Sequence, residues 1–329
     1  MAHIEVPTID VSAYLNGDAS EKESVARSLD QACREIGFLI ITGHEISPEV
    51  IEKTRLVARQ FFGLSSETKT RCKNPPRGYR ALGSTAFSYS RGVKTPPDIR
   101  EAYSMGPCDF PDDDYHRNSK GHFTPNPWPD EVPSMKDAFC NYFRVMEELG
   151  RKMMRLCALA LKLPESFFDK KFDRASDSLV VNYYPRQTVK PVEGQLRGGA
   201  HTDYGAITLL QRDNTPGGLQ VRTKDDQWID LPYVENSFVL NIGDMLSQWT
   251  NDHWRSTLHQ VVNPPWDTSR NTDRISMAFF YDPNYETQIL PLETCCSPND
   301  PPKYELMTAG EHKMMKMKKM QSVNAQTNE

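Results

Sequence analysis

Three residues of metal-ligand type occur at two places in the second half of the chain. His201 and Asp203 are separated only by Thr202, and His259 follows much later. Side chains two residues apart on a strand point to the same face, so an imidazole and a carboxylate can converge, and a neighbouring strand can add a second imidazole. Two imidazoles and one carboxylate leave three positions open on an octahedral metal, which is typical of non-haem Fe(II) sites that bind O2 and a cosubstrate. The spacing therefore predicts a redox metal site, with a polar strand end as the alternative.

Two further polar pairs have the same two-residue spacing. Arg274 and Ser276 begin one β-rich run, and Asn182 and Tyr184 end an earlier one. A guanidinium next to a hydroxyl suits a terminal carboxylate, because arginine offers two parallel charged hydrogen bonds. Each pair alone would fit a solvent-facing strand equally well. Three such pairs together predict a polar pocket, because an inner sheet face normally carries apolar side chains.

The first half of the chain is predicted to contain most of the helices. Ser20 and Glu23 have capping-box spacing, which predicts a helix that ends before Gly37. The other predicted elements are strands at 6–11 and 38–42, a helix from Ser47-Pro48 to Gly63, a largely irregular segment at 75–128 with short strands near 78–87 and 101–105, and a long helix at 134–161.

After residue 176 the pattern changes to short β-rich runs separated by turn residues. Many short strands at near-regular spacing predict a closed or double-sheet antiparallel architecture, with a jelly roll as the leading candidate. We expect an N-terminal region at 1–176, a β core at 177–290 and a C-terminal tail at 291–329, all in one compact unit. A solvated helix is expected near 311–319. The predicted strands are 178–184, 206–211, 218–222, 227–230, 237–242, 257–262 and 274–281.

The composition is that of an ordinary globular protein. Of the 329 residues, 38% are hydrophobic and 25% are charged, and the net charge is −5. These values exclude global disorder and the strong excess of basic residues that is typical of nucleic-acid-binding proteins. The longest apolar run, at 38–41, is far shorter than the roughly 20 residues that span a bilayer, and residues 1–10 do not resemble a secretion signal. We expect a cytoplasmic monomer or weak homo-oligomer whose partner is a small molecule.

The seven cysteines are odd in number and show no CxxC spacing. Neither a disulfide framework nor a zinc ribbon is indicated by this pattern. We therefore expect reduced thiols.

Short motifs follow one another in a characteristic order along nearly the whole chain. They are Pro7-Thr8-Ile9-Asp10, Gly37-Phe38-Leu39, Gly43-His44, Gly78-Tyr79, Glu101-Ala102-Tyr103, Asn182-Tyr183-Tyr184-Pro185, His201-Thr202-Asp203-Tyr204-Gly205, Gly217-Gly218-Leu219-Gln220-Val221, Asn241-Ile242-Gly243-Asp244, Ser256-Thr257-Leu258-His259 and Arg274-Ile275-Ser276. Each motif is weak alone. Their order and spacing together resemble the isopenicillin N synthase-like family of Fe(II)/2-oxoglutarate-dependent dioxygenases.

The resemblance implies a mainly β, α+β fold: a distorted double-stranded β-helix (jelly roll) with flanking N-terminal helices and one long central helix. It implies an enzyme that uses Fe(II), 2-oxoglutarate and O2 to oxidise an unactivated C–H bond of a small molecule, as in secondary metabolism. The implied ligands are His201, Asp203 and His259 for iron, and Arg274, Ser276, Tyr184 and Asn182 for 2-oxoglutarate.

The resemblance also implies a substrate pocket with an aromatic lining. Hydroxylation is the default outcome, with desaturation and ring formation left open, and the retained carboxylate of Asp203 disfavours halogenation. A secondary metabolite, a nucleobase or an amino-acid-derived compound would suit such a lining. Core packing is an equally good role for any one of these residues, which are Tyr79, Phe87, Tyr204, Ile207, Phe279 and Tyr281.

Three alternative functions remain open. An isopenicillin N synthase-like oxidase would need no 2-oxoglutarate, and Gln326 in the tail is similar to the glutamine that completes the resting iron site of such an enzyme. A non-catalytic jelly-roll protein would use the polar pairs to hold a ligand without iron. A Zn(II) hydrolase would accept the same three ligands but would leave Arg274 and Ser276 without a role.

Overall fold

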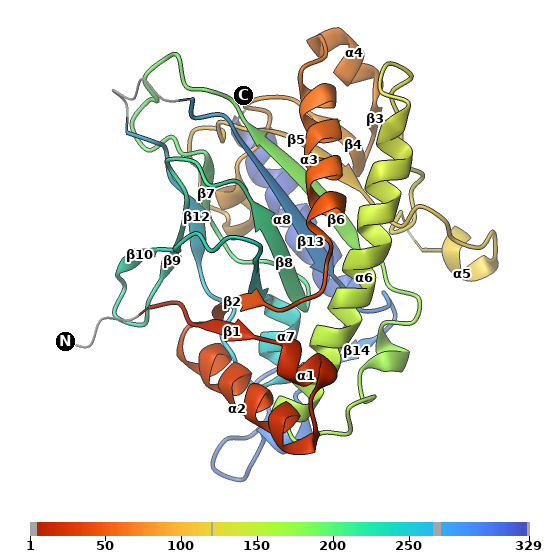
Figure 1. Cartoon of the computed structure of the whole chain (residues 1–329), viewed down its shortest axis with the longest axis vertical. Helices are drawn as coiled ribbons and strands as arrows, with labels where there is room; N and C mark the ends of the chain where they lie inside the picture. The colour runs from red at the N-terminus through yellow and green to blue at the C-terminus, as the bar shows by residue number, and fades with distance from the viewer. Residues whose placement is uncertain (1–4, 120, 266–270, 328–329) are drawn as a thin grey trace.

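Two β-sheets pack against each other and form the centre of the molecule (Figure 1). The computed structural model describes residues 5–119, 121–265 and 271–327, except the side chains of residues 321 and 323–327. Tyr184 and Val239 of one sheet share a buried apolar cluster with Val221 and Val261 of the other. This arrangement confirms the predicted jelly roll.

The larger sheet has nine strands in the order β1-β2-β11-β8-β13-β6-β5-β4-β3. Strands from the first half of the chain lie at both edges of this sheet, and strands from the second half form its middle. The smaller sheet has the order β10-β9-β12-β7, and β14 pairs with β15. The strands are β1 (Thr8–Asp10), β2 (Phe38–Thr42), β3 (Lys73–Asn74), β4 (Arg77–Arg80), β5 (Glu101–Met105), β6 (Ser178–Tyr184), β7 (Gly198–His201), β8 (Ile207–Arg212), β9 (Leu219–Arg222), β10 (Trp228–Asp230), β11 (Phe238–Ile242), β12 (His259–Val261), β13 (Arg274–Tyr281), β14 (Gln288–Ile289) and β15 (Met307–Thr308).

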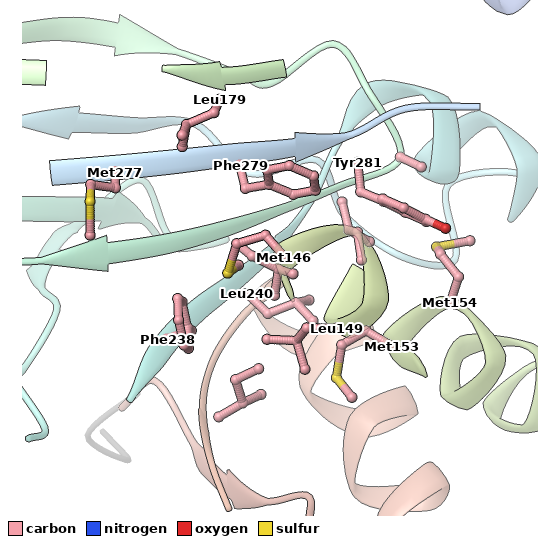
Figure 2. Packing of buried hydrophobic residues seen from close by; sticks show 14 of the residues in the cluster. Met146, Leu149, Met153, Met154, Leu179, Phe238, Leu240, Met277, Phe279 and Tyr281 are labelled. Carbon is pink, nitrogen blue, oxygen red and sulfur yellow. The ribbon is translucent and has the colours of Figure 1, made fainter. Parts of the chain in front are cut away.

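Helices cover the outer face of the larger sheet. The long helix α6 runs beside this sheet, and α2 and α3 pack against α6 (Figure 1). Met146 and Leu149 of α6 lie close to Leu240 and Phe279 of the sheet in the main core (Figure 2). The helices are α1 (Ser12–Asn16), α2 (Ala19–Glu35), α3 (Pro48–Phe62), α4 (Ser66–Arg71), α5 (Asp114–Arg117), α6 (Ser134–Ala160), α7 (Asp244–Trp249) and α8 (Ala309–Thr327), with 3-10 helices η1 (Phe87–Arg91), η2 (Asp169–Lys171) and η3 (Glu293–Cys295).

The alternation of side chains along β13 separates an apolar face of the larger sheet from a polar one. Met277 and Phe279 belong to the main core against α6. Arg274 and Ser276 are separated from Met277 and Phe279 by an odd number of positions along the strand. Their side chains therefore project from the opposite face, toward the smaller sheet. Tyr184, which pairs with Arg274, packs in the cluster between the two sheets and marks the same inner face. The inner face is therefore where polar groups can gather.

Several predicted elements need correction. Helix α2 begins at Ala19 because Asp18 and Glu21 form the capping box, whereas the predicted pair Ser20 and Glu23 lies within the helix. The strand predicted at 78–87 is shorter, and η1 follows it. Strand β7 and helix α7 lie outside the predicted elements, since two glycines obscure the strand pattern and a six-residue helix is too short to show a period.

The expectation of reduced thiols is wrong for one pair of cysteines. Cys108, after β5, forms a disulfide with Cys140 of α6, and their Cα atoms are 5.8 Å apart. The other five cysteines are unpaired within the described residues. Because pairing depends on distance in the fold, the separation of 32 residues in sequence gave no indication of it.

The C-terminal helix α8 packs on the body of the protein and is longer than the solvated helix predicted at 311–319. His312 is fully buried, and Lys313 Nζ lies 2.7 Å from Asp282 Oδ2. No helix in the described part of the chain is long and apolar enough to cross a bilayer. The tail is therefore a structural element that covers part of the β core.

A partly buried carboxyl on α6 is expected to make stability depend on pH. Burial raises the pKa of Glu147 to about 7, and burial and the charge of Glu147 raise the pKa of Asp177. A raised carboxyl pKa means that the folded state binds more protons, so the free energy of unfolding falls as pH rises from about 4.5 to 7. Glu147→Gln should remove this decrease in the free energy of unfolding, which is at most about 3 kcal/mol. The substitution should therefore raise the Tm at pH 8 but not at pH 4.5.

Thermal unfolding across this pH range tests the prediction, with Glu148→Gln as the matched control. Glu148 is the next residue, is exposed and pairs with Arg151 at 2.5 Å. Its substitution should not change the pH dependence of the Tm. If the Tm of Glu147→Gln changed with pH in the same way as the Tm of the parent, the raised pKa would not belong to Glu147.

Candidate metal and cosubstrate site

His201, Asp203 and His259 meet between the two sheets. His201 ends β7 and His259 begins β12, and the two residues pair directly across these antiparallel strands. One Asp203 oxygen, Oδ1, lies 3.8 Å from Nε2 of each histidine. The three ligand atoms lie within 4.8 Å of one another, and all three residues are buried. The structure thus brings together the three residues that the sequence predicted.

Hydrogen bonds orient both imidazoles toward this point. Nδ1 of His201 is 2.8 Å from the carbonyl oxygen of Gly199, and Nδ1 of His259 is 3.0 Å from that of Thr257. Because a carbonyl oxygen only accepts, we assign the proton to Nδ1 in each ring, which leaves the Nε2 lone pair free for a metal. Burial and the neighbouring His259 lower the pKa of His201 to about 3, so this ring is neutral.

The carboxylate of Asp203 is held by two polar residues that the sequence analysis did not assign to the site. Thr208 Oγ1 donates to Asp203 Oδ2 at 2.6 Å, and Asn241 Nδ2 donates to the same oxygen at 2.8 Å. Burial opposes ionisation of Asp203, but the nearby imidazoles and these hydrogen bonds lower its pKa. The sequence indicates Asn241 most clearly, because it is the one polar residue of strand β11, whereas β8 contains other polar residues besides Thr208. Oδ1 remains free to face the histidines.

Arg274, Ser276, Tyr184 and Asn182 also come together on the inner face. Arg274 pairs with Tyr184, and Ser276 pairs with Asn182, across β13 and β6. Arg274 is 1% exposed, and Nη1 donates to the carbonyl oxygen of Gly217 at 3.1 Å. Its Nε has no partner within the described residues. A buried guanidinium with an unsatisfied donor fits an incoming carboxylate.

The donor set suits the metal that the motifs imply. Two imidazoles and one carboxylate on one side of a point are the ligands typical of non-haem Fe(II) oxygenases. Arg274 and Ser276 lie on the facing inner surface and supply the donors that a 2-oxo acid needs at its distal end. The residues present therefore fit both Fe(II) and 2-oxoglutarate.

Two of the six predicted pocket residues lie beside this site. The Phe87 ring stacks on the His201 ring, with centroids 4.1 Å apart and planes inclined by 13°. Tyr204 follows Asp203 directly and is partly buried. Tyr89, in the same 3-10 helix η1 as Phe87, packs with Ala86 and Met320.

The other four belong to the main core, so a pocket role is wrong for them. The Tyr79 hydroxyl donates to Glu101 Oε2 at 2.7 Å, and Ile207 packs on the face of β8 that meets the core. Phe279 contacts Phe143 of α6 edge-on, and Tyr281 stacks on Phe172. Phe279 and Tyr281 are an odd number of residues from Ser276, so they point away from the site.

Helix α8 is tied to the loop that carries the metal-ligand motif. Lys316 Nζ lies 2.6 Å from Asp244 Oδ2 and 5.9 Å from the centre of the Tyr204 ring. Asp244 in turn accepts hydrogen bonds from Ser256 Oγ and Thr202 Oγ1. Gln326 lies within α8, but its side chain is outside the described residues. The helix therefore braces the segment between His201 and Asp203.

Loss of the Lys316–Asp244 ion pair should loosen α8. Lys316→Ala is expected to lower the free energy of unfolding by about 1 kcal/mol, because the pair is only partly exposed. Cleavage of the C-terminal segment by a protease should also become faster. Lys318→Ala is the control, since Lys318 is exposed on the same helix. Equal stability and cleavage rates for the two variants would contradict this role.

Two family models match most of the chain. Residues 6–131 match the N-terminal model of the non-haem dioxygenases in morphine synthesis. Residues 175–283 match the 2OG-Fe(II) oxygenase superfamily, and this range contains the three candidate metal ligands, Arg274 and Ser276. Both matches confirm the resemblance seen in the sequence.

Curated relatives and solved structures agree with these matches. The chain is 32% identical to a validamycin A dioxygenase of Streptomyces hygroscopicus subsp. limoneus, over 87% of this chain and 79% of that protein. It is 35% identical to a homoarginine-6-hydroxylase of Arabidopsis thaliana, over 88% of each chain. The structure of a full-length Neurospora crassa protein in complex with alpha-KG and thymine matches with a TM-score of 0.83 and 31% identity, over 98% of this chain and 97% of that one. The chain therefore belongs to the 2OG-Fe(II) oxygenase superfamily and is an Fe(II)- and 2-oxoglutarate-dependent dioxygenase.

Proposed function

We propose that His201, Asp203 and His259 hold the Fe(II) of this dioxygenase. The convergence of their three ligand atoms in a buried position supports this assignment. The carbonyl groups behind each histidine fix the ring orientation, and Thr208 and Asn241 hold the unused oxygen of Asp203. These contacts keep the site in the geometry that binds the metal.

The distal carboxylate of 2-oxoglutarate binds to Arg274 and Ser276. The observation that carries the proposed function is the buried guanidinium of Arg274, which has no carboxylate partner among the described residues. Tyr184 lies beside it, with its ring centre 5.8 Å from Arg274 Cζ. Asn182 accepts a hydrogen bond from Arg100 at 2.9 Å and lines the same face. A bound anion would neutralise the arginine and satisfy its free donor.

The reaction is the oxidation of an unactivated C–H bond of a small molecule, as in secondary metabolism. Bound Fe(II), 2-oxoglutarate and O2 supply the oxidising power, and 2-oxoglutarate is converted to succinate and CO2. The protein orients the substrate above the metal and excludes water between the two sheets. Phe87, which stacks on His201, and Tyr204, which follows Asp203, are the predicted pocket residues that would contact such a substrate.

Anaerobic spectroscopy tests this function directly. Protein loaded with Fe(II) should develop a visible charge-transfer band when 2-oxoglutarate is added, and O2 should then convert 2-oxoglutarate to succinate. A mass increase of 16 Da or a loss of 2 Da in a metabolite mixture would identify the substrate and the outcome. Iron-loaded protein that never binds 2-oxoglutarate would contradict the proposal, and O2 uptake without any 2-oxo acid would instead favour the oxidase.

Two further properties remain predictions from the sequence. A monomeric or weakly associated state is checked by sedimentation at several protein concentrations, and a cytoplasmic location is checked by fractionation of the source cells.

A further inference from the structure

Arg80 shares the inner face of the larger sheet with the cosubstrate residues. It pairs with Ala102 of β5, Ala102 pairs with Asn182 of β6, and Asn182 pairs with Ser276 of β13. Residues directly opposite on neighbouring strands project to the same side of a sheet. Tyr79, the residue before Arg80, projects to the other side and packs in the main core. Arg80 therefore extends the row of polar residues beyond Asn182.

A second arginine, Arg100, connects this row to the metal site. Its Nη1 donates to Asn182 Oδ1 at 2.9 Å, and its guanidinium carbon lies 3.8 Å from the centre of the Phe87 ring. The Phe87 ring also stacks on the metal-ligand candidate His201, at 4.1 Å between ring centres. Arg100 is thus separated from a candidate metal ligand by one aromatic ring.

The charges of these two arginines are not balanced by the protein. Asp98 is the only carboxylate paired with either of them in the described structure, and its Oδ2 lies 3.4 Å from Arg100 Nε. Asp98 also accepts hydrogen bonds from the backbone N–H groups of Phe87 and Gly199. The only hydrogen bond of Arg80 to a described residue is from Nη2 to the carbonyl oxygen of Pro76, at 3.3 Å. The two guanidinium groups therefore have one carboxylate partner between them in the described residues, and it pairs with Arg100.

The surroundings of Arg80 favour an additional anion. Burial, and then the charge of Arg100, lower the pKa of Arg80 to about 10, so the guanidinium remains charged at neutral pH but is unfavourably placed. The proposed function leaves Arg80 without an anionic partner, since Asp203 faces the metal site and the distal carboxylate of 2-oxoglutarate binds Arg274. An unpaired charge in a partly buried site is costly unless a ligand neutralises it. The remaining molecule in the reaction is the substrate.

We propose that the substrate is an organic carboxylate whose acidic group binds to Arg80, with Arg100 beside it, while its reactive carbon lies near Phe87 and the metal. This inference rests on the proposed function. A guanidinium offers two parallel N–H donors that match a carboxylate, which gives the enzyme a means of selecting acids over neutral molecules of the same shape. Arg80 and Arg100 are then positioning residues for specificity, distinct from the arginine that binds 2-oxoglutarate.

Paired probes test this inference on the full-length protein loaded with Fe(II) and 2-oxoglutarate under anaerobic conditions. The probes are phenylacetate, 3-phenylpropionate, octanoate and decanoate, each compared with its primary amide. Binding is followed by the change in the charge-transfer band. At least one acid should bind about 10- to 100-fold more tightly than its amide. Arg80→Gln should remove this preference, and Arg80→Lys should restore part of it.

The controls separate this inference from the proposed function. Arg80→Gln should leave the affinity for 2-oxoglutarate within about twofold of the parent, because Arg274 is unchanged. Arg186→Gln replaces an exposed arginine outside the site and should keep the preference for acids. If 2-oxoglutarate binds but no acid binds more tightly than its amide, or if Arg80→Gln keeps the preference, the inference is wrong. Failure to bind 2-oxoglutarate at all would instead contradict the proposed function.

Discussion

Asp203→Asn is expected to abolish stoichiometric iron binding while the protein stays folded. The variant keeps the shape of the side chain, and its amide oxygen can still accept from Thr208 and Asn241. The amide NH2 group would then face the two histidines in place of the carboxylate oxygen, and an NH2 group is a donor that cannot ligate a metal. Loss of even an outer contact to a metal ligand costs about 10- to 100-fold, so loss of the ligand itself should lower turnover by at least about 100-fold.

Iron content after anaerobic loading and desalting, together with succinate formation, measures this effect. Thr208→Val should give an intermediate result, with iron affinity reduced by about 10-fold, because it removes one of the two hydrogen bonds that hold the carboxylate. Asp225→Asn replaces an exposed carboxylate in the turn after β9 and should behave like the parent. An Asp203→Asn protein that retains a full complement of iron would contradict the ligand assignment.

Arg274→Gln is expected to raise the KM for 2-oxoglutarate by at least about 100-fold, since each hydrogen bond to a charged group contributes about 1.5–3 kcal/mol. Arg274 is almost fully buried, and burial lowers the pKa of its guanidinium. Without 2-oxoglutarate the variant should be at least as stable as the parent, because it removes a buried charge with no carboxylate partner among the described residues. Added 2-oxoglutarate should raise the Tm of the iron-loaded parent but not that of the variant.

Arg274→Lys distinguishes charge from geometry at this position. Lysine keeps the positive charge but lacks the planar pair of donors, so only part of the affinity should return. Arg222→Gln, on β9 of the smaller sheet, replaces a half-exposed arginine that pairs with Asp226 and serves as the control. An unchanged KM for 2-oxoglutarate in Arg274→Gln would show that the cosubstrate binds elsewhere.

Local spacing in the sequence was enough to predict the chemical groups of the site. His201 and Asp203 share a face because side chains two residues apart on extended backbone point the same way, and the same rule applies to Arg274 and Ser276. This rule also excludes Phe279 from the face of Ser276, since an odd separation reverses the direction. The pocket prediction for Phe279 followed the family analogy instead of the rule, and the structure corrects it.

Contacts between distant segments could be known only from the tertiary structure. The disulfide between Cys108 and Cys140 is such a contact, since other cysteine pairings fit the sequence equally well. The cap of α2 is local, but Asp18 with Glu21 and Ser20 with Glu23 have the same spacing, and only the structure shows which pair begins the helix. The sequence did not indicate that Arg80 and Arg100 belong to the site. Their common face is set by the strand register that runs through β4, β5 and β6. The sequence by itself therefore determined which groups can bind iron and a 2-oxo acid. Only the pairing of strands decided which other charges surround them, because electrostatic interactions depend on distance in space and not on separation along the chain.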